Sequence, residues 1–134
     1  MKISSILIAV LIFLPTATFA KVVDVRMVNT TTNGGPGFVP DLIRLTPGDS
    51  VHFVASDLGH NVQSIPGMLP VKASSFGGEL NNSFTVTFDK PGLYGFKCSP
   101  HYFIGMVGLI VVGDTHNEDE IKKISHPGMA KTIF

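Results

Sequence analysis

The sequence contains a single cysteine among its 134 residues, so Cys98 cannot form a disulfide within the chain. The Cys-x-x-Cys-His motif that attaches haem in c-type cytochromes is therefore absent. A free cysteine is often buried as a small apolar side chain. The residues around Cys98 must decide whether its thiol has a chemical role.

Charged residues are also scarce, at 15% of the chain, with ten basic and ten acidic side chains. Residues 1–20 contain only Lys2, so without them nine basic residues face ten acidic ones, a net charge of −1. Nucleic-acid-binding proteins usually need a concentrated basic face, and none is visible. The balance indicates no nucleic-acid partner and no basic segment for a membrane surface.

The main apolar run, Ile6–Leu14, is too short to span a bilayer, which requires roughly 20 residues. It follows Lys2 and precedes the small-x-small triplet Thr18-Phe19-Ala20, an order typical of a cleaved signal peptide. We predict cleavage after residue 20 and a soluble periplasmic protein that starts at Lys21. An uncleaved anchor and secretion into the medium are the alternatives.

The remaining residues, 21–134, suit one globular domain, because 44% of the chain is apolar and no repeats are present. Apolar residues alternate with period two in Val51–Ala55 and Phe84–Phe88, and turn signals such as Thr46-Pro47-Gly48-Asp49 separate such segments. Short strands at this spacing predict an all-β sandwich.

The C-terminal residues have a different pattern. Thr115 is a candidate N-cap for a helix that carries Glu118, Asp119 and Glu120 in its first turns and lysines after them, an order that suits the helix dipole. A second short helix is expected after Pro127. We expect both to pack on the sandwich.

Metal-binding side chains gather after one predicted strand. Alternation places Tyr94, Phe96 and Cys98 on one side of that strand, and His101 and Met106 follow within the next loop. His60, bounded by Gly59 at the end of another strand, supplies a fourth donor if the sandwich brings it alongside. Two imidazoles and a thiolate with a weak axial thioether are the donor set of type 1 copper sites.

Other interpretations of these residues are weaker. Zinc prefers four Cys or His ligands, and a methionine suits copper better. A Cys-His nucleophile pair would make the protein a hydrolase, but no third orienting group is evident. His52, His116 and His126 are interpreted as ordinary surface or core residues. Each donor alone would be a weak signal, whereas the set is specific.

The mature chain resembles the pseudoazurins, a family of cupredoxins, along its whole length. The resemblance is carried by these segments: Gly59-His60-Asn61-Val62, Tyr94-Gly95, Lys97-Cys98, Pro100-His101-Tyr102 and Gly105-Met106-Val107-Gly108. It implies an eight-stranded Greek-key sandwich with one or two short C-terminal helices. It also implies one copper ion, Cu(I)/Cu(II), bound by His60 and His101 through Nδ1, by the Cys98 thiolate and axially by Met106. Asn61 would brace the site.

The resemblance implies a monomeric electron carrier rather than an enzyme, with periplasmic partners such as a nitrite reductase or a c-type cytochrome. A protein that stores or delivers copper is the alternative function. The chain departs from its relatives at Phe103 and Ile104, which make the ligand loop bulkier, and at Leu58, where lysine is frequent. Residues 74–78 also lack lysine, although Lys97 and Lys72 remain. We therefore expect weak charge steering of any partner.

Overall fold

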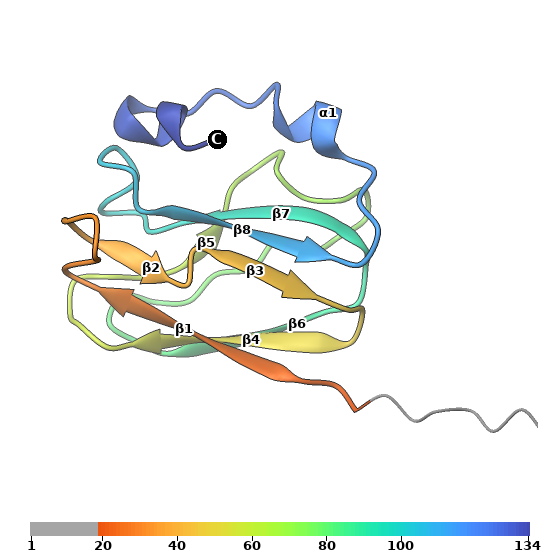
Figure 1. The fold of residues 1–134 in the computed structure, drawn as a ribbon, viewed down its shortest axis with the longest axis horizontal. Helices are drawn as coiled ribbons and strands as arrows, with labels where there is room; N and C mark the ends of the chain where they lie inside the picture. Colours follow the sequence, from red (N-terminus) through yellow and green to blue (C-terminus); the bar gives the residue numbers. More distant parts are fainter. Residues whose placement is uncertain (1–18) are drawn as a thin grey trace, which may run out of the picture.

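Two four-stranded β-sheets pack face to face in the computed structural model, which describes residues 19–134 (Figure 1). Lys2 and Ile6–Leu14, on which the signal-peptide prediction depends, lie outside the described residues. The strands are β1 (Val22–Val28), β2 (Gly37–Val39), β3 (Leu42–Leu45), β4 (Asp49–Ala55), β5 (Gln63–Ser64), β6 (Phe84–Phe88), β7 (Gly92–Lys97) and β8 (Val107–Val112). The predicted β-sandwich is confirmed.

Both sheets are mixed, because strands distant in sequence pair as neighbours. One sheet has the order β2-β1-β4-β6, in which β1 and β4 run parallel from Val22 opposite Ser50 to Met27 opposite Ala55. The other has the order β3-β8-β7-β5, in which β3 and β8 run parallel. The remaining pairs are antiparallel. These crossovers bring loops from separate parts of the chain to the same end of the sandwich.

The core forms where the inward faces of the two sheets meet, as the period-two pattern predicts. In β4 the alternate residues Val51 and Phe53 are fully buried, and Phe53 packs edge-on against Phe96 of β7 with ring centroids 5.2 Å apart. Phe38 of β2 adds a third ring, 4.8 Å from Phe96. Interlocked aromatic rings bury a large apolar area, so they anchor the ends of β4 and β7 that lead into the loops described below.

Strand β7 departs from simple alternation, because both of its faces are covered. Its inward residues Tyr94 and Phe96 join the main core, while Leu93 packs in a second cluster with Met68 and Ile121. Gly95 fits beneath the same methionine, since an added Cβ would lie 2.6–2.9 Å from Met68 side-chain atoms. A loop and the C-terminal segment therefore form an outer layer over this sheet (Figure 1).

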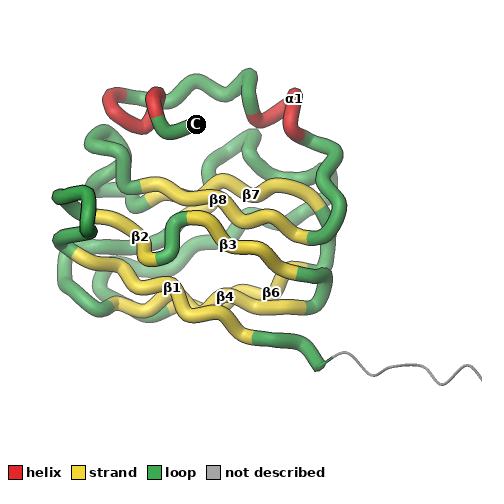
Figure 2. Tube along the Cα trace, in the orientation of Figure 1, coloured by secondary structure: helices red, strands yellow, loops and turns green. Residues whose placement is uncertain are grey.

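The C-terminal segment contains α1 (Glu118–Ile121) and a 3₁₀ helix (Gly128–Thr132), and it runs along the outer side of the β7–β8 sheet (Figure 2). The predicted cap at Thr115 is wrong: the N-cap residue is Asn117, and the Thr115 hydroxyl bonds to the Glu118 carboxylate. Asn117 is fixed there because its buried amide exchanges two hydrogen bonds with the backbone of Leu93. Neither helical segment among residues 19–134 is long and apolar enough to cross a membrane.

Candidate metal centre

His60 is fully buried in the loop between β4 and β5. Gly59 adopts a positive φ of 93°, a conformation that glycine accepts readily, and its N–H donates to Asn81 Oδ1 over 2.6 Å. The His60 carbonyl accepts from the Asn81 N–H over 2.8 Å. Asn81 therefore holds the backbone on both sides of the His60 Cα and fixes the direction of the ring.

Cys98, His101 and Met106 lie in one closed loop between β7 and β8. The Cys98 N–H donates to the Met106 carbonyl over 3.0 Å, and the Met106 N–H donates to the His101 carbonyl over 3.1 Å. Both Cys98 and Met106 are fully buried, whereas His101 is half-buried. The backbone of the loop thus ties these three residues to one another.

Asn61 joins the two segments, as the resemblance to pseudoazurins implies. Its Oδ1 accepts from the Ser99 N–H over 2.8 Å, a contact that links the loop of His60 to the loop of Cys98 across 38 positions of sequence. The Ser99 hydroxyl adds a bond of 2.7 Å to Gln63 Oε1 in β5. These contacts hold the two loops in a fixed relative position before any ion binds.

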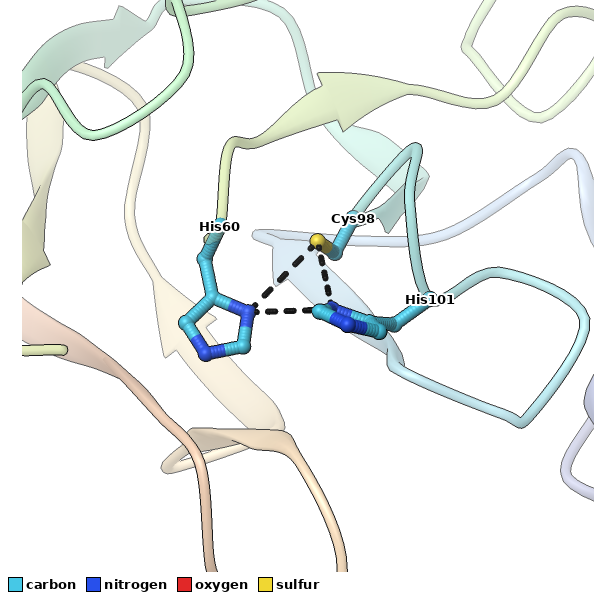
Figure 3. A group of neighbouring side chains, drawn as sticks. All are labelled: His60, Cys98 and His101. Atoms are coloured by element: carbon cyan, nitrogen blue, oxygen red, sulfur yellow. Dashed lines mark hydrogen bonds between the residues drawn. The ribbon is translucent and has the colours of Figure 1, made fainter. Parts of the chain in front are cut away.

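The donor atoms of His60, Cys98 and His101 point toward one another (Figure 3). The two Nδ1 atoms are 3.1 Å apart, and Cys98 Sγ lies 3.8 Å from His60 Nδ1 and 3.6 Å from His101 Nδ1. Donors bonded to one ion at about 2.0–2.3 Å are separated by roughly 3–4 Å. The spacing therefore fits a single metal ion among the three atoms.

A contact from Asn29, the residue after β1, sets the protonation of His60. Its Nε2 lies 2.9 Å from Asn29 Oδ1, an amide oxygen that can only accept, so Nε2 carries the proton and Nδ1 presents its lone pair to the site. Burial lowers the pKa of His60, and the neighbouring His101 ring lowers it further, while Asp57 opposes the shift. The ring is thus neutral at physiological pH and ready to bind a metal.

Burial also raises the pKa of the Cys98 thiol, although backbone hydrogen bonds from Asn61 and His101 oppose the rise. Pro100 contributes no such bond, because it has no N–H. A thiol that coordinates a metal ion would be deprotonated outright, with its proton released to solvent. Two neutral imidazoles and one thiolate are softer donors than carboxylates and favour copper or zinc over calcium or magnesium.

The residues between His101 and Met106 are held by what we call the C-terminal strap, residues 126–133. The Tyr102 hydroxyl lies 2.8 Å from His126 Nδ1, and the Met129 N–H donates to the Phe103 carbonyl over 2.8 Å. A Cβ on Gly128 would lie 2.2 Å from that same carbonyl oxygen, so the strap and the ligand loop are in close contact. On the other side of the Tyr102 ring, Lys97 Nζ lies 4.5 Å from the ring centroid.

The other three histidines lie outside this cluster, and the sequence interpretation did not count them among the metal ligands. His52 pairs with Asp24 on the outer face of the β1–β4 sheet, His116 is exposed, and His126 belongs to the strap. Among the residues that the structure describes, only His60, Cys98 and His101 form a cluster of three potential metal ligands of the His, Cys, Asp and Glu types.

An eight-stranded mixed sandwich with two imidazoles, a thiolate and a methionine in the loops β4–β5 and β7–β8 defines a cupredoxin, the class of protein that binds type 1 copper. A family profile described as copper-binding proteins of the plastocyanin/azurin family matches residues 25–113. The pseudoazurin of Methylorubrum extorquens is 44% identical over 92% of this chain and 82% of its own length, and that of Paracoccus pantotrophus is 42% identical over 92% and 86%.

Solved structures agree with the sequence relatives. The crystal structure of pseudoazurin from Methylobacterium extorquens AM1 superposes with a TM-score of 0.81 at 43% identity, covering 84% of this chain and 92% of that one. Pseudoazurin from Hyphomicrobium denitrificans gives 0.79 at 35% identity, covering 83% and 90%. The chain belongs to the plastocyanin/azurin family of copper-binding proteins and, within it, to the pseudoazurins. It is a type 1 copper electron carrier.

Sequence reasoning missed two supports of this site. Asn29 contacts His60 across 31 positions of sequence, and no local motif marks it. His126 was interpreted as an ordinary residue, although it holds Tyr102 next to His101. The one available signal was the Pro127-Gly128 pair, because Pro-Gly marks turns in sequence. In the structure Gly128 has a positive φ of 52°, where the chain turns onto the ligand loop.

Proposed function

We propose that His60, Cys98, His101 and Met106 hold one copper ion and that the mature protein shuttles single electrons between redox proteins of the periplasm. The observation that carries this proposal is the convergence of two Nδ1 atoms and one Sγ within 3.1–3.8 Å at a buried position. Bound copper alternates between Cu(I) and Cu(II) and so supplies a one-electron couple.

Fixed ligands favour electron transfer over copper storage or delivery. Delivery requires exposed ligands that exchange readily, whereas His60, Cys98 and Met106 are completely buried. Asn29 and Asn61 hold the ligand loops from outside, and such outer contacts set ligand geometry and tune the metal. A site that keeps one geometry in both oxidation states lowers the reorganisation that accompanies electron transfer.

The same burial supports an electron carrier rather than an enzyme, because three of the four proposed ligands are completely buried. His101 is the half-buried member of the set, so its ring edge is the shortest route for an electron to the surface. Two large apolar side chains nearby in sequence are exposed, Leu58 at 74% and Phe103 at 67%. We place partner docking over this apolar surface around His101.

Transient redox complexes bury less than about 1,200 Å², which allows rapid association and release. We propose a periplasmic redox protein as the partner, either a nitrite reductase or a c-type cytochrome. We also propose that this chain binds its partner as a monomer. The predicted signal peptide supports the compartment. The net charge of −1 after cleavage, derived from nine basic and ten acidic residues, supports a docking mode with little electrostatic steering.

An absorption spectrum of the copper-loaded protein tests the ligand set. The protein should be intensely blue when oxidised and should lose its colour when a reductant is added. Cys98→Ser should abolish the visible band, because that band requires a thiolate on Cu(II). His116→Gln, which changes an exposed histidine outside the cluster, serves as the control and should stay blue.

Met106→Gln is the second arm of this experiment. The amide oxygen replaces a soft axial thioether, so the variant should retain copper and show a lower reduction potential by voltammetry. A blue Cys98→Ser protein would show that the proposed coordination is wrong. An unchanged potential in Met106→Gln would remove Met106 from the ligand set while leaving the other three in place.

A further inference from the structure

Asp49 is a buried carboxylate at the first position of β4. Its side chain is almost completely buried, with a residue exposure of 3%. Oδ2 accepts from the backbone N–H of Thr46 over 2.8 Å and from the Thr46 hydroxyl over 2.9 Å, and Oδ1 accepts from the backbone N–H of Lys21 over 2.9 Å. Burying a carboxylate is costly unless it is hydrogen-bonded and paired with a cation. The three hydrogen bonds meet the first condition, and the second remains to be explained.

The cation nearest to this carboxylate is poorly placed. Lys21 Nζ is 4.0 Å from Asp49 Oδ2, at the limit of an ion pair, and its side chain is 54% exposed. The same Nζ donates instead to the Arg44 carbonyl over 3.1 Å. The Lys21 side chain therefore compensates the buried charge only weakly.

The backbone of Lys21, by contrast, is held firmly. Its carbonyl accepts from the Ser50 N–H over 2.9 Å, and its N–H points at Asp49, just before β1 begins at Val22. The two preceding residues are exposed, Phe19 at 92%. The bond between Ala20 and Lys21 thus lies between two exposed residues and the first residue held by the sandwich. It is also the bond at which the sequence predicts cleavage.

We propose that Asp49 is the binding site for the α-ammonium group that signal cleavage creates at Lys21. Hydrolysis by a signal peptidase adds one water molecule across the Ala20–Lys21 bond. Ala20 leaves as a carboxylate, and the nitrogen of Lys21 becomes a charged –NH₃⁺ group. The nitrogen that already lies 2.9 Å from Oδ1 thereby becomes a cationic donor, and charge-assisted hydrogen bonds are about twice as strong as neutral ones.

Two properties follow from this pairing. The α-amino group should have a pKa above its usual 7.7–8.0, because the carboxylate stabilises the charged form. A raised pKa stabilises the fold fully below the unfolded value, and this contribution is lost as pH rises through the folded value. The ε-ammonium of Lys21 also faces Asp49, with Nζ 4.0 Å from Oδ2, so the test must separate the two amines of Lys21.

The experiment uses the copper-loaded protein exported by a bacterium and purified from the periplasm. Mass spectrometry identifies its first residue, and an NMR titration measures the α-amino pKa in three forms: wild type, Lys21→Ala, and a variant with one added residue before Lys21. Lys21→Ala removes the ε-ammonium and keeps the α-amine. The added residue moves the α-amine away from Asp49.

We expect Lys21 as the first residue and an α-amino pKa at least one unit above about 8 in wild type and in Lys21→Ala. The extended variant should return to the usual value, and so should Asp49→Asn if it folds. A different first residue, an ordinary pKa in wild type, or a shift that disappears in Lys21→Ala would overturn the proposal. Blue colour is independent of all these outcomes, so failure here is distinct from failure of the copper assignment.

Discussion

At the scale of single residues, the ligands depend on partners that never touch the metal. Asn29 shows this most clearly, because its Oδ1 fixes the tautomer of His60 from the position just after β1. Without that acceptor the ring can turn, and its proton can move to Nδ1, the atom that faces Cys98 and His101. Asn29 thus fixes the orientation and protonation of His60 without binding the ion itself.

Asn29→Ala should therefore weaken copper binding about 10- to 100-fold, the usual cost of losing an outer hydrogen bond to a ligating histidine. Competition with a chelator of known affinity measures the change. Asn82→Ala is a matched control, because Asn82 is exposed and its amide bonds only weakly to Glu79 over 3.4 Å. Equal affinities in the two variants would show that Asn29 does not position His60.

At the scale of elements, the C-terminal strap determines the shape of the ligand loop. Gly128 can approach the Phe103 carbonyl because it lacks a Cβ, and its φ of 52° is unfavourable for other residues. Gly105 is similarly close to Ile133, where an added Cβ would lie 2.9 Å from Cδ1. At both glycines, the strap and the segment between His101 and Met106 therefore pack too closely to leave room for a side chain.

Gly128→Ala should lower the unfolding free energy by about 1–3 kcal/mol and change the reduction potential, because the added methyl group forces Phe103 away from the strap. Gly34→Ala is the control: its φ is 81°, but nothing lies within 4 Å of the added Cβ. Thermal unfolding and voltammetry on both variants provide the test. If the two substitutions had equal effects, the strap would not support the loop.

His126 gives the strap a pH dependence. Burial lowers the pKa of its ring, and Nε2 is buried without a hydrogen-bond partner among the described residues. The unfolded chain therefore binds the proton more readily, so the stabilisation by neutral His126 is complete above about pH 6.5 and is lost as pH falls toward the folded pKa. Acid conditions should loosen the strap.

Unfolding of wild type and His126→Gln in urea, measured from pH 8 to pH 5, tests this expectation. The stability advantage of wild type should be constant above pH 7 and should shrink below about pH 6.5. Tyr102→Phe keeps the buried imidazole and removes its hydroxyl partner, so it should be less stable at every pH and still lose stability in acid. If the difference in unfolding free energy between wild type and His126→Gln stayed constant down to pH 5, protonation of His126 would not destabilise the strap.

At the scale of the whole molecule, the exposed side chains that closely follow His101 in sequence, Phe103 and Ile104, are apolar rather than basic. Lys97 remains near the ligand loop, but it is half-buried over the Tyr102 ring. Leu58 is apolar and 74% exposed. Long-range attraction to an acidic partner should be weak, and contact with Phe103 should govern how long the complex lasts.

Raising salt from about 10 to 150 mM shortens the screening length from roughly 30 to 8 Å, and we expect only a modest fall in electron-transfer rate. Phe103→Ser should slow transfer more, as measured by stopped-flow mixing with a periplasmic copper nitrite reductase. Val71→Ser is the control, since Val71 is exposed and follows Pro70, which contacts Gly92 at the opposite end of β7. A steep fall with salt and a harmless Phe103→Ser would show that lysines guide docking.

The sequence alone determined the elements whose signals are local. Strands β4 and β6 follow from alternation, and three of the four proposed ligands fall within nine residues, so their proximity needs no knowledge of the fold. Family resemblance supplied the eight-strand sandwich and the place of His60. The type 1 copper class was predictable because few other proteins combine these donors at this spacing.

Tertiary structure decided what depends on contacts between distant segments. Asn117 rather than Thr115 begins α1 because its amide bonds to Leu93 of β7, and a propensity pattern contains no information on that partner. Asn29 reaches His60 because β1 and β4 run parallel. The strap covers the ligand loop through His126 and Gly128, whereas the local pattern predicts only that a short helix after Pro127 packs on the sandwich, not which loop it contacts. Such contacts arise from packing between elements, and only the folded chain brings those elements together.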